Sequence, residues 1–283
     1  MIGWTTPRGW ALITAGFALA LLIPAFVTQN FLLHIAILVL FSAYLGQAWN
    51  IAGGYAGQRS FGHAVFVGTG AYVTAILQTR FGWNPWLTLP PAMAGGAAVG
   101  WLIGFLSFRA GLRGSYFALI TLAFSEVARI LANSLEITRG GLGILIPLSP
   151  GFANFQFANK GNFFIVVLVM VAVAFGIAWW LEKSRFGARL VAVRENEDAA
   201  AALGVDTFKA KLHALMLSGG MAALGGSFYV QYYLYVEPPI AYGVERSVEM
   251  LLVTMIGGSG TVLGPLVGSV ALHLISDTTR HFL

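Results

Sequence analysis

The sequence contains no cysteine, and only 10% of its 283 residues are charged. The lack of cysteine excludes disulfides, thiolate metal sites and cysteine nucleophiles. Soluble domains usually carry about 25% charged residues, so this chain has too little charge to solvate a globule of its size. It also has no G-x-x-x-x-G-K-[ST], H-E-x-x-H or G-x-S-x-G motif. We therefore expect no catalytic residues, metal or cofactor, and an intramembrane enzyme is disfavoured.

Hydrophobic residues make up 58% of the chain, and the mean hydropathy is +0.78. The apolar runs are continuous and about 20 residues long, as in membrane-spanning helices, whereas barrel strands alternate. The 35 glycines suit close helix packing in lipid. The sequence predicts an all-α membrane protein, a polytopic bundle of about eight to ten helices in one transmembrane domain, 1–283. The runs lie near 10–28, 31–52, 63–79, 88–108, 115–135, 162–181, 211–234 and 248–276.

The first run has an alternative interpretation as a signal peptide, because Arg8 precedes the apolar stretch 11–27. No small-x-small cleavage site clearly follows this stretch, so a retained span is expected.

The basic residues between the spans predict the orientation of the chain. With the N-terminus in the cytoplasm, only four fall outside, namely Arg80, Arg139, Lys160 and Arg246. Ten fall inside, namely Arg8, Arg59, Arg109, Arg113, Lys183, Arg185, Arg189, Arg194, Lys209 and Lys211. The positive-inside rule then places segment 182–210 in the cytoplasm, and it explains the net charge of +5 without a nucleic-acid partner.

Two glycine-rich stretches interrupt the apolar runs and predict broken helices near 53–62 and 257–265. Irregular backbone at membrane depth is tolerated only where it is buried in protein or lines a water-filled cavity. The polar residues beside the first break are therefore candidates for the translocation path: Tyr55, Gln58, Ser60 and His63. For His63, a packing role is the alternative.

Segment 182–210 is the one stretch that concentrates charge of both signs. Its four alanines and the following Gly204 predict a short helix that ends near Leu203. Small side chains let a helix lie in a groove of a partner protein, although a solvated connector is the ordinary alternative. The surface offered to water or to a partner is expected to include Arg194, Glu195, Asn196, Glu197 and Asp198.

Glu126 and Arg129 lie three residues apart within the fifth expected span. Charged groups in lipid are costly, and this spacing places both side chains on one helix face. We expect a structural intramembrane ion pair, buried against neighbouring helices. A role in the translocation path, with Glu126 as a proton carrier, is the alternative.

Four blocks of the sequence, in order, resemble the LivM-type permeases of bacterial branched-chain amino-acid importers. They are Gly54–His63, Arg113–Phe124, Ser184–Asp206 and Ile256–Gly268. Arg59 and Phe61 depart from the family pattern at two leucine positions, Ala188 and Arg189 are in reversed order, and Arg139 is an unexpected charge in an outer glycine-rich segment.

The resemblance implies a permease subunit of an ATP-driven importer in the inner membrane. Its implied partners are a second, LivH-type permease subunit, two ATP-binding subunits and a periplasmic solute-binding protein. It also implies a coupling helix that docks on the ATP-binding subunit. The residues that match the coupling segment are Arg194, Glu195, Asn196, Glu197, Ala199, Ala200 and Gly204.

The resemblance implies that specificity in such systems is set largely by the binding protein and not by the permease. Branched-chain amino acids are expected. Urea, short amides or another amino acid are alternatives, and an ion-coupled secondary transporter is a further one.

Overall fold

The computed structural model describes residues 16–17, 19–27 and 29–282, with side chains up to Ser276. Part of the expected span near 10–28 lies outside these residues. In its described part, Leu21 and Leu22 form a turn before the short helix α2 (Ile23–Phe26). Pro24 lies in the first turn of α2, where its missing N–H is tolerated.

Four of the described helices are long and apolar enough to cross a membrane. The first joins α3 (Asn30–Asn50) to a π-helical turn, η1 (Ile51–Tyr55). The others are α5 (Pro85–Arg109), α6 (Gly114–Ser134) and α7 (Lys160–Lys183). The apolar runs of the sequence predicted each of these helices to within a few residues.

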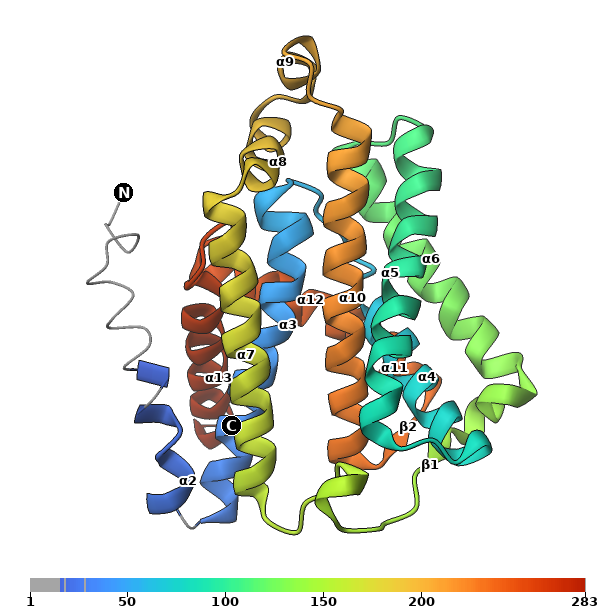
Figure 1. Cartoon of the computed structure of the whole chain (residues 1–283), viewed down its shortest axis with the longest axis vertical. Coiled ribbons are helices and arrows are strands. Elements are labelled where there is room, and N and C mark those ends of the chain that lie inside the picture. The colour runs from blue at the N-terminus through green and yellow to red at the C-terminus, as the bar shows by residue number, and fades with distance from the viewer. Residues whose placement is uncertain (1–15, 18, 28, 283) are drawn as a thin grey trace.

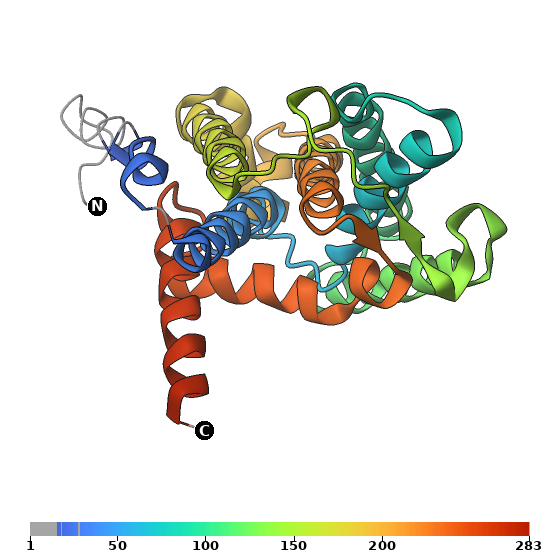
Figure 2. The same ribbon diagram turned by 90° about the horizontal axis from the view of Figure 1, so that it is seen from below.

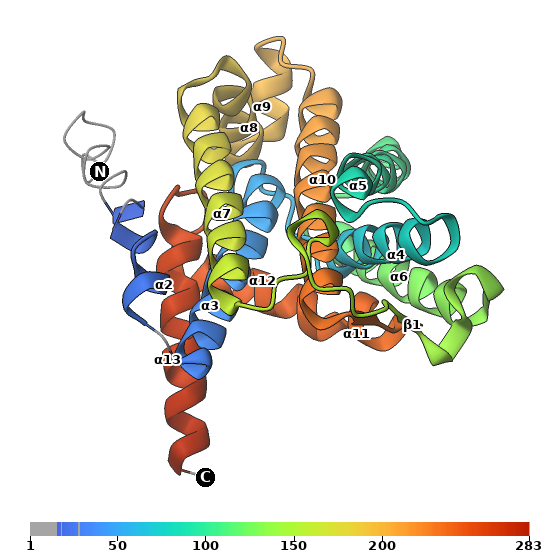
Figure 3. The same ribbon diagram turned by 60° about the horizontal axis from the view of Figure 1, so that its bottom comes forward.

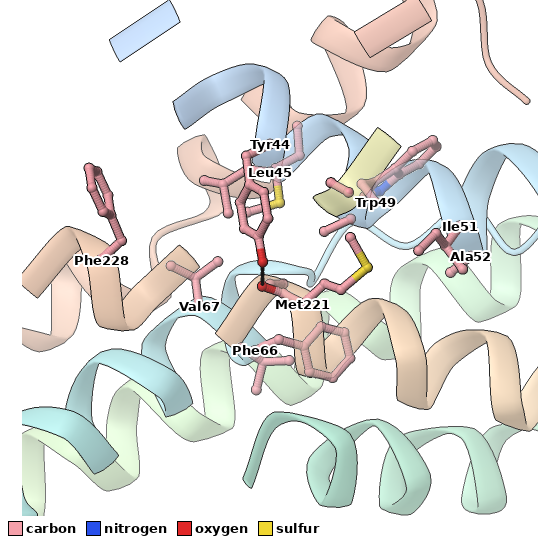
Figure 4. Packing of buried hydrophobic residues seen from close by; sticks show 14 of the residues in the cluster. Tyr44, Leu45, Trp49, Ile51, Ala52, Phe66, Val67, Met221 and Phe228 are labelled. Atoms are coloured by element: carbon pink, nitrogen blue, oxygen red, sulfur yellow. Dashed lines mark hydrogen bonds between the residues drawn. The ribbon is translucent and has the colours of Figure 1, made fainter. Parts of the chain in front are cut away.

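The centre of the bundle is formed by α10 (Thr207–Tyr233), which packs against α4 (Ala64–Phe81) and α5 (Figure 1). Glycines allow this close approach: a Cβ added at Gly70 would lie 1.9 Å from the Ala223 carbonyl oxygen, and one at Gly226 would lie 1.9 Å from that of Val67. Figure 4 shows the apolar packing around this contact, where Tyr44 donates a hydrogen bond of 2.8 Å to the Met221 carbonyl.

The final apolar run is broken, as predicted, into α12 (Val244–Gly257) and α13 (Gly264–Phe282). Figure 2 shows α12 lying across one side of the bundle and α13 projecting from its edge. Both helices contact α3.

The two ends of the bundle differ in structure (Figures 1 and 3). One end has α8 (Arg185–Glu195) and α9 (Glu197–Ala202). The other has an irregular loop with three 3-10 turns, Glu136–Thr138, Gly140–Leu142 and Phe152–Asn154. In this loop β1 (Ile144–Leu145) pairs antiparallel with β2 (Tyr235–Val236), which precedes α11 (Pro238–Tyr242).

Two local features differ from the sequence-based expectation. Segment 182–210 forms two helices instead of one, because Asn196 adopts an extended conformation (φ −158°) between α8 and α9. The strand pair and α11 were not predicted, since each is too short to leave a periodic pattern.

Candidate functional site

Arg194 ends α8 and extends into the space between the two broken segments. Its Nη1 donates a hydrogen bond of 3.0 Å to the Gly54 carbonyl oxygen in η1. A Cβ added at Gly260 would lie 2.5 Å from the same nitrogen, and one at Gly57 would lie 2.9 Å from the Arg194 side chain. The glycines of both breaks therefore make room for the Arg194 side chain. No local sequence pattern indicated this arrangement.

Asn50 joins the two broken segments directly. Its Oδ1 accepts a hydrogen bond of 2.7 Å from the Gly260 N–H, and its Nδ2 donates one of 2.9 Å to the Thr261 carbonyl. The residue is fully buried. A buried amide that satisfies backbone groups some 210 residues away fixes the position of both breaks. Sequence analysis missed Asn50, although a polar residue just before a Gly-Gly break is a usable signal.

Glu197 anchors the start of α9 to the bundle by two contacts. Its carboxylate contacts Lys211 Nζ on α10 and lies 3.2 Å from Arg113 Nε at the α5–α6 turn. Lys211 is only 5% exposed and also lies over the Phe108 ring at 4.8 Å. Because a buried ammonium needs a counter-charge, Glu197 and Lys211 depend on each other.

Asp198 extends this charge cluster with a bond of 3.0 Å to Arg113. Its hydrogen bond, together with the charge of Glu197, raises the pKa of the exposed Arg113 guanidinium. The α5–α6 turn and α10 are thereby tied to the same helix.

The rest of α9 divides into a buried and an exposed side. Asn196 caps the helix by accepting a hydrogen bond of 3.0 Å from the Ala199 N–H, and Gly204 follows its end with φ +84°. Ala200 is 3% exposed and packs within this chain. Ala199 is exposed, and the side chain of Leu203 is 86% exposed. Thus Ala199 and Leu203, not Ala200, lie on the surface of the described chain.

The charged residues around Asn196 divide in the same way. Glu197 turns into the chain and its side chain is only 14% exposed. The other four residues are exposed, and the side chain of Glu195, which pairs with Arg194 at 2.7 Å, is 68% exposed. The expected exposure is thus found for all of these residues except Glu197.

The four candidates for the path are near one another in the chain, and each has a partner within it. Tyr55 donates to Glu182 at 3.3 Å, and Gln58 donates to the Ala56 carbonyl at 3.0 Å. His63 Nε2 lies 2.7 Å from Ser218 Oγ, and the Ser60 carbonyl accepts from Trp49 Nε1 at 2.8 Å. Gln58 alone is half-buried, while the other three are buried. Their role in the path stays a prediction.

Glu126 and Arg129 form the expected ion pair on α6, with Arg129 Nε donating to Glu126 Oε2 at 2.9 Å. Their side chains are 44% and 36% exposed. The expected burial of the pair against neighbouring helices is thus absent within the described residues.

The fold and the site together define an all-α, polytopic membrane protein with a charged helical extension at one end. Residues 27–283 match the model of the family described as "Branched-chain amino acid transport system / permease component". The chain belongs to this family, which consists of transport permeases and not of enzymes.

Known relatives align with this chain over different lengths. The LivM high-affinity branched-chain amino acid transport system permease of Escherichia coli is 30% identical over 94% of this chain and 68% of its own. The probable LivH branched-chain amino acid permease of Methanocaldococcus jannaschii is 26% identical over 79% and 72%. The Salmonella typhimurium autoinducer 2 import system permease LsrC is 32% identical over 41% and 33%. Each is named as a permease protein of transport or import.

Proposed function

We propose that this chain is the membrane-spanning permease subunit of an ATP-driven importer in a bacterial inner membrane. One transmembrane domain, residues 1–283, passes leucine, isoleucine and valine, and separate subunits hydrolyse ATP. The proposed partners are a second, LivH-type permease, two ATP-binding subunits and a periplasmic solute-binding protein. The observation that carries the proposal is the hydrogen bond from Arg194 of α8 to the first broken segment, which Asn50 in turn joins to the second, in a chain of the permease family.

In this proposal, α9 docks in a groove of the ATP-binding subunit through its exposed residues Ala199 and Leu203. Movement of α9 acts on the bundle by two routes. Arg194 transmits it to η1 and to the loop at Gly260, while Glu197 transmits it to α10 and, through Arg113, to α6. The broken segments then rearrange to expose the path alternately to the two sides.

The path passes beside the first break in this proposal, where Tyr55, Gln58, Ser60 and His63 cluster. Their polar groups lie along irregular backbone, which at membrane depth must be enclosed by protein or border water. Gln58, as the half-buried member, is the one best placed to meet a solute.

Branched-chain amino acids are the proposed substrates because the LivM and LivH relatives align over 94% and 79% of the chain. The LsrC relative belongs to an autoinducer import system, but it aligns over only 41%. An ion-coupled transporter needs neither ATP-binding nor solute-binding subunits, so co-purification separates it from the proposed importer.

A bulky residue on the exposed side of α9 tests the coupling role. Ala199→Trp should insert and accumulate normally, because residue 199 lies on the surface, but it should hold α9 away from its groove. In the reconstituted complex, the loaded binding protein should then stimulate ATP hydrolysis less. Solute uptake should fall as well. Ala188→Trp, at an exposed alanine on α8, is the matched control. Normal stimulation in Ala199→Trp would return α9 to the status of a solvated connector.

A further inference from the structure

A cavity of about 460 Å³ opens at the end of the bundle opposite α8 and α9. It is bounded by the end of α4, by the α4–α5 turn and by the loop that follows α6. Pockets of this size hold small molecules. Its lining includes Arg139, Gln78 and Trp83, and none of the lining residues is acidic.

Arg139 lines this cavity with no counter-charge. No acidic side chain within the described residues forms an ion pair or hydrogen bond with its guanidinium. Its backbone is left-handed (φ +58°), a conformation that is unfavourable for a bulky residue and that is enriched at functional sites. Thr138 fixes the turn, since its buried hydroxyl contacts the carbonyls of Ala132 and Leu135 at 2.6 and 2.7 Å. The backbone is thus fixed while the guanidinium stays unpaired.

Gln78 lines the same cavity. Its Nε2 is buried and has no hydrogen-bond partner among the described residues. One helical turn before Gln78, Thr74 of α4 donates a hydrogen bond of 2.8 Å to Ser227 of α10. Gln78 and Gln231 each follow one of these two residues by four positions, so they occupy matching positions on the two helices. Gln231 is 1% exposed, and both of its amide atoms are also unpaired among those residues. Buried amides without partners indicate a missing polar ligand or water.

The opposite wall of the cavity is built by internal hydrogen bonds of the outer loop. Gln156 accepts from the Ser149 N–H at 2.6 Å and donates to the Pro147 carbonyl at 3.0 Å. Asn154 donates to the Ser149 carbonyl at 3.1 Å. These polar groups are satisfied, so they hold the wall in place, whereas Arg139 and Gln78 keep side-chain donors without a partner among the described residues.

We propose that this cavity binds the carboxylate of a small solute, of the kind that an amino acid carries, before the solute enters the path. A guanidinium and a neighbouring amide N–H are the donors that suit a carboxylate, and no acid in the lining opposes it. The apolar surfaces of Trp83 and Ile146 remain for an aliphatic side chain. The assignment to the outer side and to the imported solute rests on the proposed function, whereas the carboxylate specificity rests on the cavity.

Binding is measured on the assembled complex in lipid nanodiscs without its solute-binding protein, by saturation-transfer NMR with L-leucine and with L-leucinamide, which lacks the carboxylate. Leucine should bind about tenfold more tightly than leucinamide. Arg139→Gln should weaken leucine binding about tenfold. Lys160→Gln removes an outer positive charge that lies outside the cavity lining, and it should bind leucine as the unmodified complex does.

Gln78→Glu keeps the outer loop intact and places a carboxylate in the cavity, so it should weaken leucine binding as Arg139→Gln does. Equal binding by the unmodified complex and both variants would overturn the proposal. Unchanged leucine binding with weaker docking of the binding protein would also overturn it, since Arg139 would then serve an acidic side chain of that partner. If the importer carries another solute, leucine is not taken up. The weakening of leucine binding by Arg139→Gln and by Gln78→Glu can still be measured, so the two proposals are tested separately.

Discussion

The guanidinium of Arg194 donates a hydrogen bond of 3.0 Å to the carbonyl of Gly54, which lies 140 residues earlier in the chain. The contact joins the end of α8 to the π-helical turn where α3 stops being regular. A π-turn leaves backbone groups that can change partner, and such turns are frequent at functional sites. This contact joins the extension at one end to the interior of the bundle.

Arg194→Gln should uncouple α8 from the interior of the bundle. The substitution removes the hydrogen bond to Gly54, a bond from a charged donor whose loss costs about 2 kcal/mol, together with the exposed pair to Glu195, which contributes little, so the permease should still fold. ATP hydrolysis by the reconstituted complex should continue, while the solute imported per ATP should fall. Arg189→Gln, which removes an exposed arginine from the same helix, should leave this ratio unchanged. An unchanged ratio in Arg194→Gln would assign Arg194 to packing alone.

Glu197 and Lys211 should behave as a mutually dependent pair. Glu197→Gln leaves the buried Lys211 ammonium without its full counter-charge and should lower the free energy of unfolding by about 3 kcal/mol. Combining it with Lys211→Met should recover most of this loss, because no charge then remains buried. Thermal unfolding in detergent of the unmodified protein, the two single variants and the double variant measures the coupling between Glu197 and Lys211. Additive losses in the double variant would contradict the pairing.

The sequence predicted the long helices because their apolar runs are unbroken, and it predicted both breaks because glycines punctuate them. It did not predict how the breaks are held. Asn50 reaches Gly260 and Lys211 reaches Glu197 through tertiary contacts that no local pattern encodes. The break at Asn196 was missed because the following alanines favour a continuous helix, while the asparagine side chain competes as a cap.

The candidate site was predicted in part. The Glu126–Arg129 pair follows from helical spacing, and the structure forms it. Its partial exposure was not predictable, because burial depends on which face of α6 meets the other helices. The same limit applies to Ala199 and Ala200, which are adjacent in sequence but lie on opposite sides of the packing boundary.

Removing one member of the Glu126–Arg129 pair should lower the folded yield in membranes. Glu126→Gln or Arg129→Gln leaves one unpaired charge near the middle of α6, where lipid or a partner disfavours it. Replacing both residues by leucine should recover much of the yield. Size-exclusion profiles of the extracted proteins report the result. Full folding of both single variants with complete loss of transport would favour a pathway or proton-carrying role instead.

The orientation of the bundle is testable because the chain contains no cysteine to compete for labelling. Leu203, after α9, and Leu148, in the loop at the opposite end, are 86% and 72% exposed, so a cysteine at either position should be reactive without disturbing the core. The basic residues predict that α9 lies in the cytoplasm. An impermeant maleimide added to intact spheroplasts should therefore label Leu148→Cys and leave Leu203→Cys unlabelled.

In inside-out vesicles the pattern should reverse, and permeabilised membranes should label both variants. Labelling of Leu203→Cys from the periplasmic side would overturn the orientation. It would also overturn the coupling role of α9, because an ATP-binding subunit in the cytoplasm could not reach that helix.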